Sequence, residues 1–195
     1  GARLFDPRGK GHPMKAWVQI PARHSARWSH FAGLACDYVA GAAQAEKDSV
    51  IGGLRAAREK ILDAVCSLMP AQQDQVFLGE WSAKDLLAHL VGWDHTNRGA
   101  VGEILAGRKP GFWAHHDRDW KSYNARLVAE YRRDDFAELI ESVESSHRAL
   151  IEYLEAIPAD EYLKRKPIGT LLRAEASDEE EHHQQLEAFR SGRGT

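Results

Sequence analysis

Cysteine and long hydrophobic runs are both scarce in this chain. Its two cysteines, Cys36 and Cys66, do not have the CxxC spacing of a thiolate metal site and are too few for a disulfide framework. No stretch reaches the roughly 20 consecutive apolar residues that a membrane-spanning helix needs, and the mean hydropathy is −0.51. We therefore expect a soluble protein of the reducing cytoplasm, without a membrane partner.

An excess of charge of one sign is also missing. The chain has 26 lysine and arginine residues against 29 aspartate and glutamate residues, so its formal net charge is −3. No basic stripe with interleaved aromatic residues occurs in the second half of the chain. Because nucleic-acid binding usually requires such a positive surface, we expect a small molecule rather than a nucleic acid as the partner.

Alternation of β-branched and polar residues, which is typical of strands, is not sustained anywhere, so we expect no sheet. Four segments instead carry an apolar period of 3.6 residues, namely residues 46–69, 82–107, 134–157 and 167–190. Ser82 followed by Asp85 is typical of a helix start, since the two side chains can form a capping box. The pattern predicts an all-α fold, a four-helix bundle with one long crossover.

The chain is long enough for one domain plus an extension. Residues 1–45 are rich in arginine, lysine, glycine and proline and poor in acidic residues. We predict that residues 1–45 form an N-terminal basic extension and that residues 46–195 form the bundle domain. Within the bundle, Leu90 and Val143 are predicted core residues, and His147 is interpreted as a core or pocket-lining histidine.

The last predicted helix has polar residues in the middle of its apolar face. On a helical wheel, Asp178 and His182 lie in one narrow sector, and Glu179 lies away from its centre. Burial of an unpaired carboxylate costs several kcal/mol, so Asp178 would need a cation, a hydrogen-bonding partner or a water-filled pocket. One hypothesis is a divalent metal ion held by Asp178, His182 and His89 of the second helix. The other is a solvated, acidic helix end.

Several motifs resemble a known family. The segment WSAKDLLAHLVGWDHT, residues 81–96, resembles the Trp-Ser-x-x-Asp-x-x-x-His-Leu-x-x-Trp signature of the DinB/YfiT superfamily, and in particular its ClbS/DfsB branch. Residues 120–124, ESVESSHRALIEYLEAIP at 141–158 and HHQQLEAFR at 182–190 are similar to further patterns of that branch, in the same order. The resemblance covers about residues 46–190.

The resemblance implies an up-down-down-up four-helix bundle with a metal ion at one end. His89 and His182 match two of the three histidine ligands, and Asp178 stands where the commonest pattern has the third. A carboxylate also occurs there in the related mycothiol-dependent isomerases. Two histidines and a carboxylate suit zinc or nickel, with manganese or iron as alternatives. Two other pairings, Glu179 with His183 and Glu181 with Gln185, fit the helical wheel less well.

The resemblance further implies a metal-dependent small-molecule enzyme, a hydrolase or thiol transferase that acts on an electrophilic or toxic metabolite. In this hypothesis Glu175 accepts a proton from the bound nucleophile, and Trp113, Trp120 and Tyr123 of the crossover wall the pocket. The alternative is a non-catalytic bundle that binds a ligand or forms a homodimer and has a degenerate metal site.

Overall fold

The structure, a computed structural model, describes residues 3–11 and 17–192, except for the side chains of residues 3, 115–118 and 163. The chain divides into two compact units, Gly1–Ala42 and Ala43–Thr195. The first unit contains two short antiparallel strands, β1 (Arg3–Leu4) and β2 (Val18–Gln19), and the 3-10 helix η1 (Ala22–Arg27). The sequence predicted no strands. Among the named elements of the described residues, β1 and β2 are the exceptions to this prediction.

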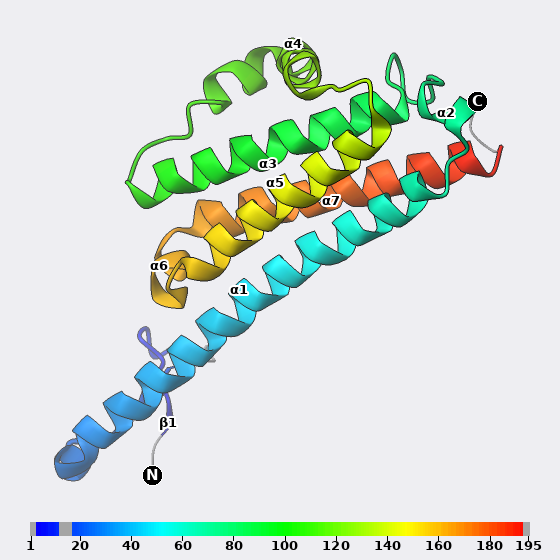
Figure 1. Cartoon of the computed structure of the whole chain (residues 1–195). Coiled ribbons are helices and arrows are strands. Elements are labelled where there is room, and N and C mark those ends of the chain that lie inside the picture. The colour runs from blue at the N-terminus through cyan, green and yellow to red at the C-terminus, as the bar shows by residue number, and fades with distance from the viewer. Residues whose placement is uncertain (1–2, 12–16, 193–195) are drawn as a thin grey trace. The chain divides into compact units, whose positions relative to one another are not determined.

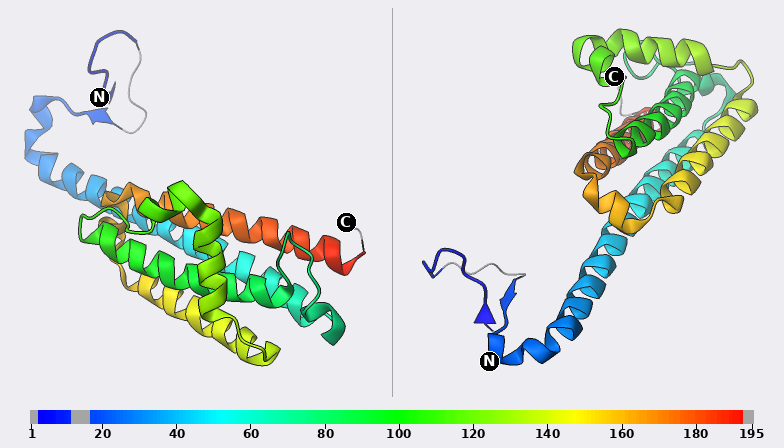
Figure 2. Two further views of the ribbon diagram at one scale, coloured as in Figure 1. Left: turned by 90° about the horizontal axis from the view of Figure 1, so that it is seen from above. Right: turned by 90° about the vertical axis from the view of Figure 1, so that its left-hand side faces the viewer.

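The second unit is a helical bundle. Its long helices are the part of α1 (Trp28–Cys66) from Ala43 onward, α3 (Ala83–Leu105), α5 (Phe136–Ala156) and α7 (Lys166–Arg190). The shorter α2 (Pro70–Gln73) and α6 (Ala159–Lys164) lie in two of the connections. Figures 1 and 2 show α1 and α7 running in one direction and α3 and α5 in the other. The predicted all-α bundle and its up-down-down-up order are therefore confirmed.

Local sequence explains where two of these helices begin. The Ser82 side chain accepts a hydrogen bond from the backbone of Asp85, whose carboxylate accepts one from the backbone of Ser82, so the predicted capping box starts α3. Asp135 starts α5, because its carboxylate accepts hydrogen bonds from the backbone N–H groups of Ala137 and Glu138. Both caps occupy donors that the first helical turn would otherwise leave unpaired.

The crossover is itself helical. The four predicted helices did not include it, yet it contains α4 (Trp113–Tyr131), which consists of two helical pieces that meet at Asp119. The Asp119 carboxylate accepts a hydrogen bond from the Ser122 backbone and so begins the second piece. Trp93 of α3 donates to Asn124 of α4 over 3.2 Å, and the views agree that α4 lies across α3. Contacts with α3 thus hold α4 in place.

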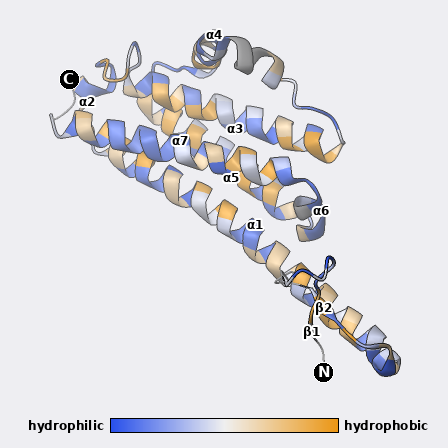
Figure 3. Cartoon of the chain, turned by 180° about the vertical axis from the view of Figure 1, so that it is seen from behind, coloured by the Kyte–Doolittle hydropathy of each residue, from blue (hydrophilic) through white to orange (hydrophobic). Residues whose placement is uncertain are grey.

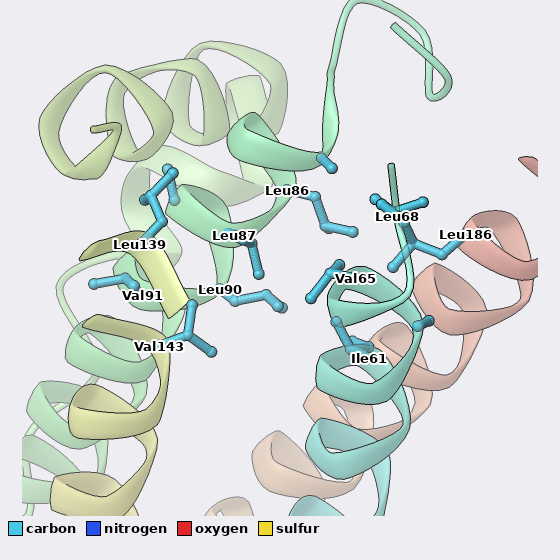
Figure 4. Packing of buried hydrophobic residues seen from close by; sticks show 13 residues of the cluster. Ile61, Val65, Leu68, Leu86, Leu87, Leu90, Val91, Leu139, Val143 and Leu186 are labelled. Carbon is cyan, nitrogen blue, oxygen red and sulfur yellow. The ribbon is translucent and has the colours of Figure 1, made fainter. Parts of the chain in front are cut away.

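The bundle core consists of two apolar clusters. Leu90 and Val143 are 1% and 0% exposed, which confirms both as core residues. They belong to the cluster in Figure 4, whose side chains from α1, α3, α5 and α7 point toward one another. The second cluster lies nearer α6 and includes Leu54, Leu154 and Leu172. Figure 3 shows apolar and polar residues interspersed along each long helix, as amphipathic bundle helices require.

Within the described residues, no helix is both long and apolar enough to cross a membrane.

Candidate functional site

A layer of buried polar side chains separates the two apolar clusters. Each long helix contributes to it at positions where its apolar stripe is interrupted. The members are at most 9% exposed: Arg58 on α1, Asp94 and Asn97 on α3, Ser146 and His147 on α5, and Glu175 and Glu179 on α7. We call these seven residues the polar layer. Because so many polar groups would be costly to bury without partners, their pairing determines what the layer can do.

Arg58 is the cation of the polar layer, and two carboxylates share its guanidinium. Its nitrogen atoms donate to the Glu179 carboxylate at 2.7 and 3.0 Å and to the Asp94 carboxylate at 2.9 and 3.1 Å. Ser146 donates a further hydrogen bond of 2.6 Å to Asp94. Burial alone would lower the pKa of Arg58, but the charges of Glu179 and Asp94 outweigh it and raise that pKa above its ordinary value.

Glu175 is the third carboxyl group of the polar layer and has no cation of its own. Its burial, and next the negative charge of Glu179, raise its pKa from 4.5 to about 8. The fully buried amide of Asn97 and the charge of Arg58 counteract this shift only in part. Glu175 is therefore mostly protonated at neutral pH.

A cavity of about 690 Å³ opens beside the polar layer. We call it the α3–α7 cavity, because these helices line it together with α4 and the turn Leu78–Trp81. Its floor includes Glu175 and Glu179, and its aromatic wall consists of Trp81, Trp93 and Trp120. This is a normal size for a small-molecule site.

The turn at the mouth of the cavity has a defined conformation. Gly79 has a φ of 61°, in the left-handed region that favours glycine. The Trp81 N–H donates to the carbonyl oxygen of Leu78, and the Leu78 N–H donates to that of Trp81. The turn holds Glu80 and Trp81 at the edge of the cavity.

Two histidines lie side by side in the α3–α7 cavity. The ring centroids of His89 and His182 are 5.4 Å apart, and the rings are nearly perpendicular. His89 also contacts the rings of Trp81 and Trp93, with centroid distances of 4.7 and 6.2 Å. His182 Nδ1 is 2.9 Å from Gln185 Oε1, and a hydrogen bond there leaves Nε2 as the acceptor.

His89 is a neutral imidazole at physiological pH. Burial, and next the nearby His182 and Arg58, lower its pKa from 6.5 to about 3. Its Nδ1 atom is buried and has no hydrogen-bond partner within the part of the chain that the structure describes. A neutral imidazole with an unused nitrogen can serve as a metal ligand.

The spacing of the His89 and His182 rings is compatible with a shared metal ion, but it does not by itself place their nitrogen atoms around one. Two imidazoles bound to one zinc ion through bonds of about 2 Å have centroids about 5 Å apart, close to the 5.4 Å between His89 and His182. Asp178 lines the same cavity but is exposed. In residues 3–11 and 17–192, no three His, Cys, Asp or Glu side chains are arranged to hold a metal ion.

The helical wheel was wrong about which carboxylate of α7 is buried. Glu179 is 1% exposed and pairs with Arg58, whereas Asp178 is exposed. The inner face of α7 passes through Leu172, Glu175, Glu179 and Leu186, because packing against the other three helices rotates that face away from the sector that the sequence suggested. Polar residues do interrupt the buried face of α7, as predicted, but the buried carboxylate there is Glu179, and it pairs with Arg58.

Sequence reasoning missed Arg58, Asp94 and Asn97. A signal was present, since Arg58 lies between Leu54 and Ile61 at the i, i+4, i+7 spacing of one helix face. Asp94 and Asn97 continue the face of Leu90 in the same way. Charged residues at such positions are usually exposed, so the pattern becomes informative only when the opposing residues are known.

Of His147 and the three crossover aromatics, Trp120 alone lines the α3–α7 cavity. His147 is 9% exposed, with Nδ1 3.6 Å from an Asp94 carboxylate oxygen, and it lines a groove of about 390 Å³ between α1 and α5. Trp120 lines the α3–α7 cavity as predicted. Tyr123 lies behind Trp93, with a centroid distance of 5.7 Å, and neither it nor Trp113 is among the residues that line the cavity.

Comparison with known proteins gives one family. Residues 54–187 match the model of the mycothiol maleylpyruvate isomerase N-terminal domain, from within α1 to the last turns of α7. No curated protein and no solved structure matches the chain. The matched domain is a member of the DinB/YfiT-like helical superfamily that the motifs resemble, and the match does not extend to the narrower ClbS/DfsB branch. The chain belongs to the mycothiol maleylpyruvate isomerase N-terminal domain family.

Proposed function

We propose that the protein is a small-molecule enzyme and that the α3–α7 cavity is its active site. The observation that carries the proposal is the pair of adjacent imidazoles, His89 and His182, in a cavity that also contains the buried acid Glu175. The reaction would be the attack of water or a thiol on an electrophilic or toxic small molecule, as in a hydrolase or a thiol transferase. Membership of a family related to mycothiol-dependent isomerases and metalloproteins supports this class in outline.

A divalent metal ion, zinc or nickel in the first place, would be held by His89, His182 and Asp178. Family members typically bind metal, which supports the assignment. When bound, such an ion supplies positive charge that lowers the pKa of a water molecule or a thiol. Asp178 lies one helical turn before His182 and lines the same cavity, which supports it as the third ligand.

Glu175 would act as a proton donor in the reaction. With a pKa of about 8, Glu175 is mostly protonated at neutral pH. It is therefore better suited to donate a proton to the product or leaving group than to accept one from the nucleophile, which is the role that the sequence suggested. Trp81 and Trp93 would exclude water around His89.

Metal analysis tests the ligand assignment. The purified protein should contain about one divalent ion per chain by plasma mass spectrometry, and His89→Ala should lose it, because removal of a ligand costs more than the 10- to 100-fold affinity loss of an outer-shell change. His95→Ala is the matched control, since His95 is exposed on the same helix and stacks on Tyr131. Full occupancy in His89→Ala would overturn the assignment.

Turnover tests the reaction class. Epoxides, cyclopropanes and maleyl-type acids would be screened with and without a low-molecular-weight thiol. We expect the rate to fall about 100-fold or more in His182→Ala, as the loss of a group that stabilises the transition state does. Equal rates in the two proteins would reject catalysis at the histidine pair.

One observation favours a second candidate, a non-catalytic bundle that binds a ligand or forms a homodimer. Within the described residues, Asp178 and the two histidines do not form a three-ligand metal group. A protein that binds ligands but carries no stoichiometric metal and turns over none of the screened compounds would support this candidate.

A further inference from the structure

We infer that the α3–α7 cavity selects small molecules that carry a cationic amine and disfavours matched acids. The amine would lie at the mouth of the cavity, near Glu80, Glu181 and the rings of Trp81 and Trp120. The inference rests on the proposed function in taking this cavity as the active site, but it concerns binding alone.

The charges at the mouth are predominantly negative. Glu80, Asp178 and Glu181 line the cavity and are exposed. Among the described residues that line it, Lys121 is the one lysine, and there is no arginine. A site for a small carboxylic acid would be expected to present an arginine or several lysines.

The polar layer does not reverse this balance. The charge of Arg58 is shared by Asp94 and Glu179, and the group of three has a formal charge of −1 because it contains one cation and two anions. Arg58 is 2% exposed and is not among the residues that line the cavity. It therefore cannot serve as an anchor for an anionic ligand.

A bound divalent ion would leave two carboxylates at the mouth uncoordinated. The proposed ligand Asp178 would offset part of the charge of the ion, whereas Glu80 lies in the turn Leu78–Trp81 and Glu181 on the exposed side of α7, outside the proposed ligand set. An electrophilic group near His89 and an amine near these two carboxylates could thus belong to one molecule.

Aromatic rings add a second mode of cation recognition at the same place. Tryptophan faces attract cations within about 6 Å of the ring centroid. The Lys121 ammonium group is 5.9 Å from the centroid of Trp120, so a ligand amine would have to displace Lys121 from this ring or contact Trp81 instead. Trp81 is held by the hydrogen-bonded turn described above, which makes its ring a preorganised wall beside Glu80.

Titration with three probes of one shape tests the selection. Benzylamine, benzyl alcohol and phenylacetate would be added to the purified full-length protein, with calorimetry as the readout. We expect benzylamine to bind at least about tenfold more tightly than phenylacetate, with benzyl alcohol between them, and the difference to shrink at high salt. Equal or tighter binding of phenylacetate would overturn the inference.

Two variants locate the selection. Glu80→Gln combined with Glu181→Gln should lower the affinity for benzylamine about tenfold and leave that for benzyl alcohol unchanged, because only the charged probe uses the carboxylates. Glu138→Gln combined with Glu141→Gln removes the same charge from exposed positions on α5 and should bind benzylamine as the wild type does. Wild-type affinity in the Glu80 and Glu181 variant would contradict the proposed location.

His182→Ala separates this inference from the proposed function. The variant should lose turnover but retain the preference for benzylamine, since His182 is not part of the amine site. Absence of turnover in the wild type, with the preference intact, would reject the enzyme and keep the amine site. Turnover together with a preference for phenylacetate would keep the proposed enzyme and reject the amine site.

Discussion

At the scale of single residues, the notable feature is how one arginine makes three buried carboxyl groups tolerable. Arg58 pairs with Asp94 and Glu179 through four hydrogen bonds, and Glu175 remains protonated instead of adding a further charge. Burial of two charges is compensated only when geometry and hydrogen bonds are both good. The polar layer meets that requirement, so its members are strongly dependent on one another.

This dependence predicts the effect of removing the cation. Arg58→Met should lower the free energy of unfolding by about 3 to 5 kcal/mol, because Asp94 and Glu179 would be left buried without a partner. Arg55→Met is the control, since Arg55 and its partner Glu155 are half exposed and such pairs contribute about 0 to 1 kcal/mol. Urea melts would measure both, and equal losses would contradict the description of the layer.

Glu175 predicts a pH dependence of stability. Its pKa is about 8 in the folded protein against an ordinary 4.5, so the folded state binds more protons between these values and wild-type stability should fall as pH rises through that window. The slope is at most about 1.4 kcal/mol per pH unit. Glu175→Gln cannot titrate there. The unfolding free energy of the wild type minus that of Glu175→Gln should therefore decrease from pH 5 to pH 8, and a constant difference would show that Glu175 is not protonated.

At the scale of elements, the crossover helix α4 completes the cavity that the bundle helices begin. Trp120 lines the α3–α7 cavity from α4, and Asn124 accepts the hydrogen bond from Trp93 of α3. The contact is close at Gly92, where an added Cβ would lie 2.7 Å from the Cβ of Leu127. Position 92 of α3 must therefore be glycine for α4 to pack this closely against α3.

Two glycines of α3 provide a matched test of this contact. Gly92→Ala should lower stability by about 1 to 3 kcal/mol, because the new methyl group meets the Cβ of Leu127, which cannot rotate away. Gly99→Ala meets nothing within 4 Å and should be neutral or stabilise by up to about 1 kcal/mol through helix propensity. Thermal melts followed by circular dichroism measure both changes. A neutral Gly92→Ala would mean that α4 does not lie tightly on α3.

At the scale of the whole molecule, the bundle unit contains its own core, helix caps and polar layer. Lys47 is buried, and its ammonium group donates to the carbonyl oxygens of Glu155 and Ile157 at the end of α5. These contacts, like both apolar clusters, lie within residues 43–195. The unit thus has the features of an independently folding domain.

The corresponding prediction concerns the N-terminal extension. A chain that begins at Ala43 should remain folded, with a Tm within a few degrees of that of the full chain, since its core clusters and caps are intact. It should also bind any metal that the full chain binds. Calorimetry and metal analysis would test this, and aggregation of the shortened chain would show that the extension covers apolar surface of the bundle.

The amino-acid sequence by itself determined the fold class. The 3.6-residue apolar period and the capping box at Ser82 are local features, and α3, α5 and α7 lie close to the residues that this pattern predicted. It also placed His89 and His182 on two helices, and only the fold could show their rings in contact.

Tertiary structure alone decided which polar residues are buried. A helix has a buried face only relative to its neighbours, so the roles of Asp178 and Glu179 depended on a rotation of α7 that its own sequence does not define. In the sequence, Arg58 and Asp94 look like surface charges. They are 36 positions apart, and only the fold brings their side chains within 2.9 Å of each other. The position of α4 across α3 is likewise set by contacts between the two helices, such as the hydrogen bond from Trp93 to Asn124.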